Sequence, residues 1–257
     1  MSTDLRVQSG GRGEPVLLLL HGLGATGDVW RGWPPVLQRR WPGRWLAPDL
    51  PGHGGSPAQA HYTFEAVADA VAAILPRDAP TVVIGHSMGG VIGLLLAGDG
   101  WRVPVERVVG LGIKVAWTDQ ELERAREMAQ RPVSYFDSRD EAAARYLRVS
   151  GLAGLIAADD PTVEPGLRTD GDRWRLAMDP RTFGVGAPDM PRLLSQARAE
   201  VVLARGEHDQ MCTRDELRAL GAPTVELPGL GHNAHVEDPE AAAILLGPFP
   251  DARPESR

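Results

Sequence analysis

The feature that most constrains this fold is a serine placed between a strand pattern and a helix pattern. The run from Thr81 to Gly85 is rich in β-branched residues, Gly85-His-Ser-Met-Gly89 has the spacing G-x-S-x-G, and a strongly apolar run follows. A serine on so sharp a turn needs strained dihedrals, and small neighbours let the strand and helix approach each other. We therefore expect Ser87 to stand above the end of a strand, although the spacing alone also fits a helix N-cap serine.

Short apolar runs alternate with longer amphipathic stretches between residues 15 and 115, and strand patterns return near residue 200. This order is typical of parallel strands joined by helical crossovers. We therefore expect an α/β fold with a mostly parallel, doubly wound sheet of about eight strands. The predicted strands are Val16–Leu20, Trp45–Ala47, Thr81–Gly85, Arg107–Gly112, Glu200–Ala204 and Thr224–Leu227.

The segment 116–191 differs in character from its surroundings. Thr118–Gln130 and Ser138–Val149 are charged and Ala-rich, and each begins with a Ser or Thr that favours a helix N-terminus. Residues 151–191 are rich in Gly, Pro and Asp, which indicates an irregular connection. Because 257 residues suit one core with an insertion, we expect a core of residues 1–115 and 192–257 and an inserted helical lid at 116–191.

Composition narrows the class of protein. Apolar residues make up 43% and charged residues 24%, as in soluble globular proteins, and the net charge of -7 argues against nucleic acid or anionic membrane as partners. Cys212 is the only cysteine, and no apolar run is long enough for a signal peptide or a membrane span, so we expect a cytoplasmic protein. No metal-binding spacing is present. We assign no metal or cofactor, expect a small-molecule partner, and leave the oligomeric state open.

A serine hydroxyl needs a base, and that base needs a group that orients it. Two late segments supply candidates, because one strand pattern ends at Asp209 and the next strand and turn end at His232. Glu207 and Asp119 are alternatives for the acid, and His235 is an alternative base that we expect to be a rim or capping residue.

The sequence resembles the α/β-hydrolase superfamily, in its serine esterase and lipase-like branch, over nearly its whole length. The resemblance implies Ser87 as nucleophile, Asp209 as orienting acid and His232 as general base, in the family's chain order. It also implies an oxyanion hole from the backbone N–H groups of Leu23 and Met88. The matching motifs are His21-Gly22, Asp49-Leu-Pro-Gly-His-Gly-Gly-Ser56, Gly85-His-Ser-Met-Gly89, Gly206-Glu-His-Asp209 and Gly231-His232.

The resemblance also bears on the four other histidines near these motifs. His21 and His53 lie in family loops that shape the oxyanion site, so we expect structural roles for them. His86 and His208 flank catalytic positions and are expected to pack or hydrogen-bond locally.

A serine rather than an aspartate at position 87 disfavours the epoxide hydrolase and haloalkane dehalogenase branches. We expect a hydrolase of small-molecule carboxylic esters or thioesters that works through an acyl-enzyme on Ser87. The alternatives are a C–C bond hydrolase, lyase or acyltransferase that uses the same triad, and a receptor-like protein with slow turnover. Apolar lid residues either line the substrate pocket or attach the lid to the core, and the candidates are Trp117, Met128, Tyr135, Phe136, Tyr146 and Trp174.

Overall fold

A computed structural model describes residues 5–247. The strands are β1 Val7–Gly10, β2 Val16–Leu20, β3 Trp45–Pro48, β4 Thr81–His86, β5 Val105–Leu111, β6 Leu167–Asp170, β7 Arg173–Leu176, β8 Glu200–Gly206 and β9 Thr224–Leu227. The α-helices are α1 Pro34–Arg40, α2 Phe64–Ala72, α3 Met88–Leu96, α4 Asp119–Gln130, α5 Arg139–Val149, α6 Met190–Gln196, α7 Arg214–Ala219, α8 Ala234–Glu237 and α9 Pro239–Ala242. Four 3₁₀ helices complete the described chain, η1 Gly27–Trp30, η2 Glu164–Gly166, η3 Pro180–Val185 and η4 Ala243–Leu246.

The main sheet has seven strands in the order β1-β3-β2-β4-β5-β8-β9. All neighbouring strands pair in parallel except β1, which pairs antiparallel with β3 at the edge. The predicted doubly wound, mostly parallel sheet is confirmed. It has one strand fewer than the expected eight or so, because within the described residues only β1 precedes the buried strand β2.

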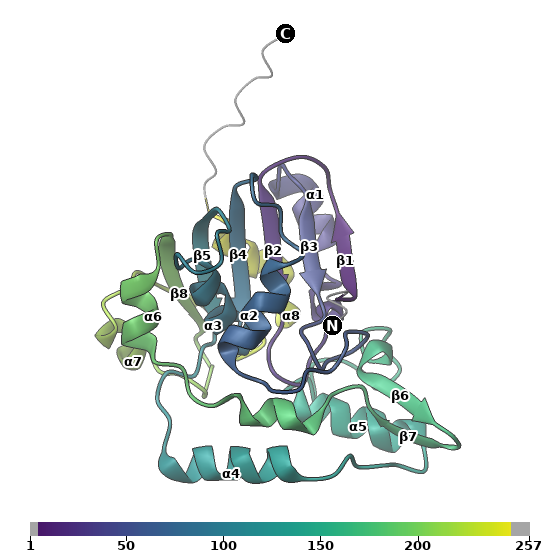
Figure 1. The fold of residues 1–257 in the computed structure, drawn as a ribbon. Coiled ribbons are helices and arrows are strands. Elements are labelled where there is room, and N and C mark those ends of the chain that lie inside the picture. The colour runs from purple at the N-terminus through teal and green to yellow at the C-terminus, as the bar shows by residue number, and fades with distance from the viewer. Residues whose placement is uncertain (1–4, 248–257) are drawn as a thin grey trace.

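Alternate residues of the strands pack into two separate hydrophobic cores, one on each face of the sheet. In β2, Leu17 and Leu19 pack into one core, and Leu18 and Leu20 pack into the other. The first core is closed by η1, α1 and η4, and the second by α2, α3, α6 and α7. Figure 1 shows α2 and α3 in front of the sheet and α1 behind it. Burial on both faces explains why β2 is uniformly apolar.

The segment 116–191 leaves the sheet after β5 and returns to it before β8. Its helices α4 and α5 begin where the sequence predicts, with Thr118 and Ser138 as N-caps. The hairpin β6–β7 was not predicted, because its residues are largely exposed and charged and so lack an alternating apolar pattern. Figure 1 shows α4, α5 and the hairpin along the lower edge of the sheet. The interpretation of this segment as a lid stays a prediction.

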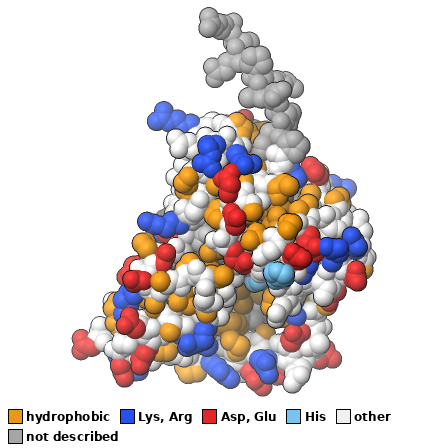
Figure 2. Space-filling model, turned by 180° about the vertical axis from the view of Figure 1, so that it is seen from behind, with side chains coloured by type: hydrophobic (Ala, Val, Ile, Leu, Met, Phe, Trp, Pro, Cys, Tyr) orange, Lys and Arg blue, Asp and Glu red, His pale blue; other side chains and the backbone are white. Residues whose placement is uncertain are grey.

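The surface carries both signs of charge. Figure 2 shows one face of the molecule, on which acidic, basic and apolar side chains are interspersed. Within residues 5–247 no helix combines the length and apolar character needed to cross a membrane.

Candidate active site

Ser87 occupies a strained turn between β4 and α3. Its φ of 49° and ψ of -116° place it among the few non-glycine residues with positive φ, a conformation that a surrounding structure must enforce. The turn is tight. A Cβ on Gly85 would lie 2.3 Å from the carbonyl oxygen of Gly89, and a Cβ on Gly89 would lie 2.6 Å from that of Leu20. Both glycines are therefore required for the helix to start so close to the sheet.

His232 and Asp209 meet at the same edge of the sheet. Nδ1 of His232 lies 3.1 Å from each carboxylate oxygen of Asp209, whose side chain is fully buried. Burial raises the pKa of the Asp209 carboxyl, but hydrogen bonds from His232 and from the Met211 amide outweigh it and lower the pKa below its usual value. Asp209 therefore stays ionised. Because a carboxylate only accepts, Nδ1 of His232 carries the hydrogen and Nε2 is free to act as a base.

Ser87 lies next to this pair. Its amide donates to the carbonyl of Leu111 at 2.7 Å. Gly112, the residue after Leu111, lies against the pair, because a Cβ on it would be 3.1 Å from both Asp209 Oδ2 and His232 Nδ1. Among the described residues, the Ser87 hydroxyl itself makes no hydrogen bond. The structure thus joins His232 to Asp209 and places Ser87 beside them, without a hydrogen bond between the Ser87 and His232 side chains. In unliganded active sites the nucleophile and base are often further apart than in the reacting complex.

His86 supports the loop that carries His232. Its Nε2 lies 3.0 Å from the His232 carbonyl oxygen, and the two rings are 4.5 Å apart. A carbonyl only accepts, so Nε2 of His86 is the donor. The expectation that His86 hydrogen-bonds locally is confirmed.

Two buried histidines hold the loop of Leu23. His21 Nε2 accepts from the amide of Leu50 at 2.8 Å, and its Nδ1 lies 2.8 Å from the Gly22 carbonyl. His53 Nε2 accepts from the amide of Gly24 at 3.1 Å. Their predicted structural roles are confirmed. Within the described chain, the amide of Leu23 and that of Met88, which opens α3, donate to no acceptor.

The placement of His235 corrects one expectation. It is neither a rim nor a capping residue, because it is 1% exposed and stacks on Trp30 at 4.5 Å and on His86 at 4.4 Å. Neither ring nitrogen has a hydrogen-bond partner. The apolar surroundings of a short helix that follows the catalytic loop were not visible in the sequence.

These buried histidines predict that stability falls in acid. Burial lowers the pKa of His21 to about 4, lowers that of His53 and His235 to about 3, and lowers that of His86 well below 6.5. Above pH 6.5 neither folded nor unfolded histidines bind protons, whereas at lower pH only the unfolded chain binds them. The free energy of unfolding should therefore be constant at neutral pH and fall as the pH drops from 6.5 toward these lowered values.

Urea unfolding across this pH range measures the effect. His235→Phe should make the loss of stability in acid smaller, because it removes one histidine that binds a proton only in the unfolded chain. Replacement of the exposed His208 by Gln should not have this effect. A urea midpoint that did not change between neutral pH and about pH 4 would contradict the prediction.

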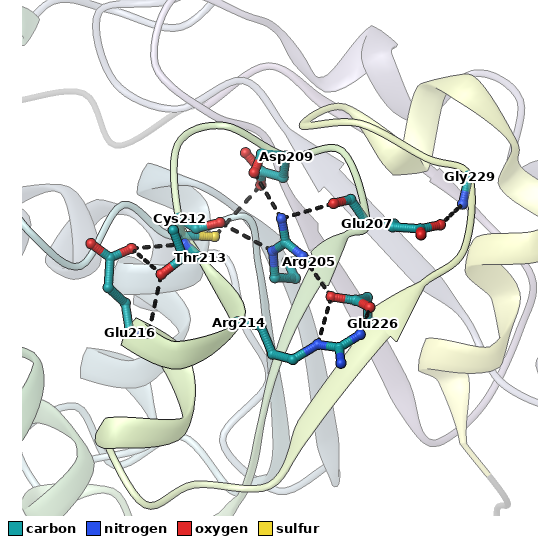
Figure 3. A network of polar contacts seen from close by, with 9 residues as sticks. All are labelled: Arg205, Glu207, Asp209, Cys212, Thr213, Arg214, Glu216, Glu226 and Gly229. Atoms are coloured by element: carbon teal, nitrogen blue, oxygen red, sulfur yellow. Dashed lines mark hydrogen bonds and ion pairs between the residues drawn. The ribbon is translucent and has the colours of Figure 1, made fainter.

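A buried guanidinium organises the loop that carries Asp209 (Figure 3). Arg205, 8% exposed at the end of β8, donates to the carbonyls of Glu207 at 3.0 Å, Asp209 at 2.8 Å and Cys212 at 3.0 Å. It also pairs with Glu226 at 2.5 Å. The side chain of Glu207 accepts from the Gly229 amide at 2.8 Å, which ties this loop to the one that leads to His232. One arginine thus fixes the backbone on both sides of Asp209.

Arg205→Met should lower the free energy of unfolding by about 3 to 5 kcal/mol, because it leaves three carbonyls without this donor, and two of the lost hydrogen bonds are buried. Arg214→Met is the matched control, since Arg214 pairs with the same Glu226 but has a side chain that is 51% exposed. Arg214→Met should lower the free energy of unfolding by less than about 1 kcal/mol. Equal losses of stability in the two variants, measured by urea unfolding, would show that Arg205 has no special structural role.

A cavity of about 320 Å³ opens at Ser87. Of the predicted pocket residues, Trp117 and Met128 line it, as do Leu23 and Met88. Its wall is mostly apolar and includes residues that sequence reasoning missed, namely Phe64, Val91, Ile113, Phe183, Val185 and Met211. No local signal identifies these residues, because they come from α2, α3, the loop after β5, η3 and the loop after β8.

The other predicted pocket residues lie outside this cavity. Phe136 lines an adjoining one and pairs through its backbone with Trp174, which packs on the core. Tyr146 is buried at 1% exposure within the core, and the exposed Tyr135 donates to Asp170 at 2.9 Å.

The remaining acid candidates are placed elsewhere. Glu207 is exposed and bonded to Gly229, and Asp119 is exposed in the first turn of α4. In the part of the chain that the structure describes, no group of three or more His, Cys, Asp and Glu residues could hold a metal ion.

A strained serine beside a His–Asp pair, at the edge of a doubly wound parallel sheet, defines an α/β protein of the hydrolase type. The chain belongs to the alpha/beta hydrolase family, whose profile matches residues 17–244. It is 32% identical over 251 residues to a pimeloyl-(acyl-carrier protein) methyl ester esterase of Aromatoleum aromaticum, which covers 91% of this chain and 97% of that protein.

Of two further comparisons, one covers only part of the chain and the other shows only the fold. The chain is 44% identical over 109 residues to the 30 kDa subunit of magnesium chelatase from Rhodobacter capsulatus, but this match covers 41% of the chain and only 37% of that protein. A thioesterase domain from the curacin biosynthetic pathway has the same fold, with a TM-score of 0.75 and 20% identity over 93% of this chain and 94% of that domain.

Proposed function

We propose that this protein is a serine hydrolase that cleaves small-molecule carboxylic esters or thioesters through an acyl-enzyme on Ser87. The observation that carries the proposal is the strained serine at the floor of an apolar cavity, next to a histidine whose Nδ1 is held by a buried carboxylate. This arrangement leaves one imidazole nitrogen available as a base beside one hydroxyl. The esterase activity named for the Aromatoleum aromaticum relative supports the same class of reaction.

The first step transfers the acyl group to the protein. Ser87 Oγ attacks the carbonyl carbon as Nε2 of His232 accepts the hydroxyl proton, and the amides of Leu23 and Met88 stabilise the negative charge that develops on the carbonyl oxygen. The ester bond then breaks, and the alcohol or thiol leaves with the proton from His232. Asp209 stabilises the imidazolium that forms in between.

The second step returns the enzyme to its starting state. Water attacks the acyl carbon while His232 accepts one of its protons, and the carboxylic acid leaves as that proton returns to Ser87 Oγ. Neither step requires a metal or a cofactor.

The segment 116–191 acts in this proposal as a lid over the reaction. Trp117 and Met128 from this segment line the cavity together with Ser87, as does Phe183 from η3. An apolar roof excludes water around the reacting bond, which strengthens the electrostatic interactions inside. We propose a cytoplasmic location, because the single cysteine allows no disulfide within the chain and the fold therefore does not depend on an oxidising compartment.

Pre-steady-state hydrolysis of p-nitrophenyl esters tests this function. An acyl-enzyme predicts an initial burst of p-nitrophenolate that matches the concentration of protein, followed by slower turnover. A series of increasing acyl length and the matching thioesters would define the preferred acyl group. If the protein hydrolysed no ester or thioester of the series, a receptor-like role on the same fold would replace the proposal.

A further inference from the structure

A second, smaller cavity adjoins the one at Ser87. It has a volume of about 90 Å³ and shares Met128 and Phe183 with the larger cavity, so these two side chains stand between them. Val149, at the end of α5, lines the smaller cavity and also faces the loop of Leu23, because a Cβ on Gly24 would lie 2.6 Å from Val149 Cγ1. The smaller cavity therefore borders the cavity that opens at Ser87.

The charged residues that line the smaller cavity are both arginines, Arg131 and Arg145. Among the described residues, neither side chain has a hydrogen bond or an ion pair. Arg145 is also half-buried. A half-buried guanidinium without a partner in the chain leaves its five N–H groups free to bind an anionic group from outside the chain.

In the larger cavity, part of the positive charge is neutralised by a neighbouring acid. Its only lysine, Lys114, pairs with Glu121 at 3.0 Å, and Glu121 also accepts from the backbone and hydroxyl of Thr118. This pair is neutral, which leaves Arg124 as the single uncompensated charge in a largely apolar wall. The two cavities together thus carry excess positive charge in a chain whose net charge is -7.

Two of the other four arginines on α4 and α5 are paired. Arg126 on α4 binds Glu123 at 2.9 Å, and Arg139 on α5 binds Glu164 at 2.9 Å. Arg124 and Arg148 also have no partner among the described residues, but both are exposed, whereas Arg145 is half-buried.

We propose that the substrate carries an anionic group, a carboxylate or a phosphate, which Arg145 binds in the smaller cavity with Arg131 beside it. This inference rests on the proposed hydrolase function and names its substrate class. The apolar part of the substrate lies in the larger cavity, with its ester or thioester carbonyl at Ser87. The fork of a guanidinium matches two oxygens of a carboxylate or phosphate, and such charge-assisted bonds are stronger than neutral ones.

Matched pairs of substrates test the proposal. The first pair is the p-nitrophenyl half-ester of a dicarboxylic acid and the p-nitrophenyl ester of the monocarboxylic acid of equal chain length. The second is an acyl-coenzyme A and the same acyl group on N-acetylcysteamine, which places the anion on the leaving group instead. The wild type should favour one charged member by about tenfold or more in kcat/KM, and the pair in which this occurs identifies where the anion lies.

Arg145→Met should remove that preference by raising the KM of the charged member toward that of the neutral member, which has no group for Arg145 to bind. Arg148→Met is the matched control, since Arg148 is exposed on the same helix and outside both cavities. Arg145→Lys should retain part of the preference.

The outcomes separate this inference from the function on which it rests. Hydrolysis of charged and neutral members at equal kcat/KM in both pairs would overturn the anion site and leave the serine hydrolase standing. A preference that survived in Arg145→Met would likewise overturn the assignment to Arg145. Failure to hydrolyse any of the four substrates would overturn both proposals.

Discussion

Ser87→Ala is expected to lower kcat for ester hydrolysis by about 10⁴-fold or more, because the variant can no longer form the acyl-enzyme. The oxyanion amides and the cavity remain, so KM should change little and a small residual rate should persist. Steady-state kinetics with a p-nitrophenyl ester measures both quantities.

The loss of activity in Ser87→Ala should not result from a loss of stability. The Ser87 hydroxyl has no hydrogen bond among the described residues, so its removal should change the free energy of unfolding by less than about 0.5 kcal/mol. Ser195→Ala supplies a matched control on α6, where the serine is exposed. A Ser87→Ala protein that melted like the wild type and kept its rate would exclude Ser87 as the nucleophile.

Asp209→Asn should lower kcat by about 10⁴-fold while the fold stays intact. Nδ1 of His232 now donates to a carboxylate at 3.1 Å, whereas an amide could present its NH₂ group and force the hydrogen onto Nε2. His232 would then be unable to accept the proton of Ser87. Because the Asn oxygen can still accept from the Met211 amide, the effect should fall on kcat more than on stability.

Asp119→Asn is the control for the acid assignment. Asp119 follows β5 and is a plausible alternative acid from its position in the sequence, but it is exposed at the start of α4. Its replacement should leave kcat within about twofold of the wild type, since exposed substitutions away from the reacting groups have small effects. A large loss in Asp119→Asn together with an active Asp209→Asn would reverse the two roles.

The sheet and the serine turn could be predicted because their signals are local. β2 and β9 have the predicted bounds, Val16–Leu20 and Thr224–Leu227, since apolar or β-branched residues between turn residues favour a strand. Ser87 could be placed because glycines at fixed spacing are needed where β4 and α3 approach each other. The helices α4 and α5 were marked by their Thr and Ser caps.

The cavity could not be predicted, because it is formed by side chains that meet only after folding. Tyr146 was a pocket candidate by residue type, yet it lies in the core, while Phe64 and Phe183 come from separate elements to line the cavity. Arg205 was missed for a related reason. An arginine before the Gly of a strand end is unremarkable in sequence, and its importance depends on the three carbonyls that the folded loop turns toward it.

Labelling with a fluorophosphonate, followed by mass spectrometry of the proteolytic peptides, tests the central claim most directly. A serine activated by His232 and Asp209 should form one adduct per chain, located on Ser87 within the peptide that spans β4 and α3. The adduct should be absent in Ser87→Ala and should form much more slowly in Asp209→Asn. An adduct on any other residue, or the absence of an adduct in a protein that still hydrolyses esters, would contradict a nucleophilic Ser87.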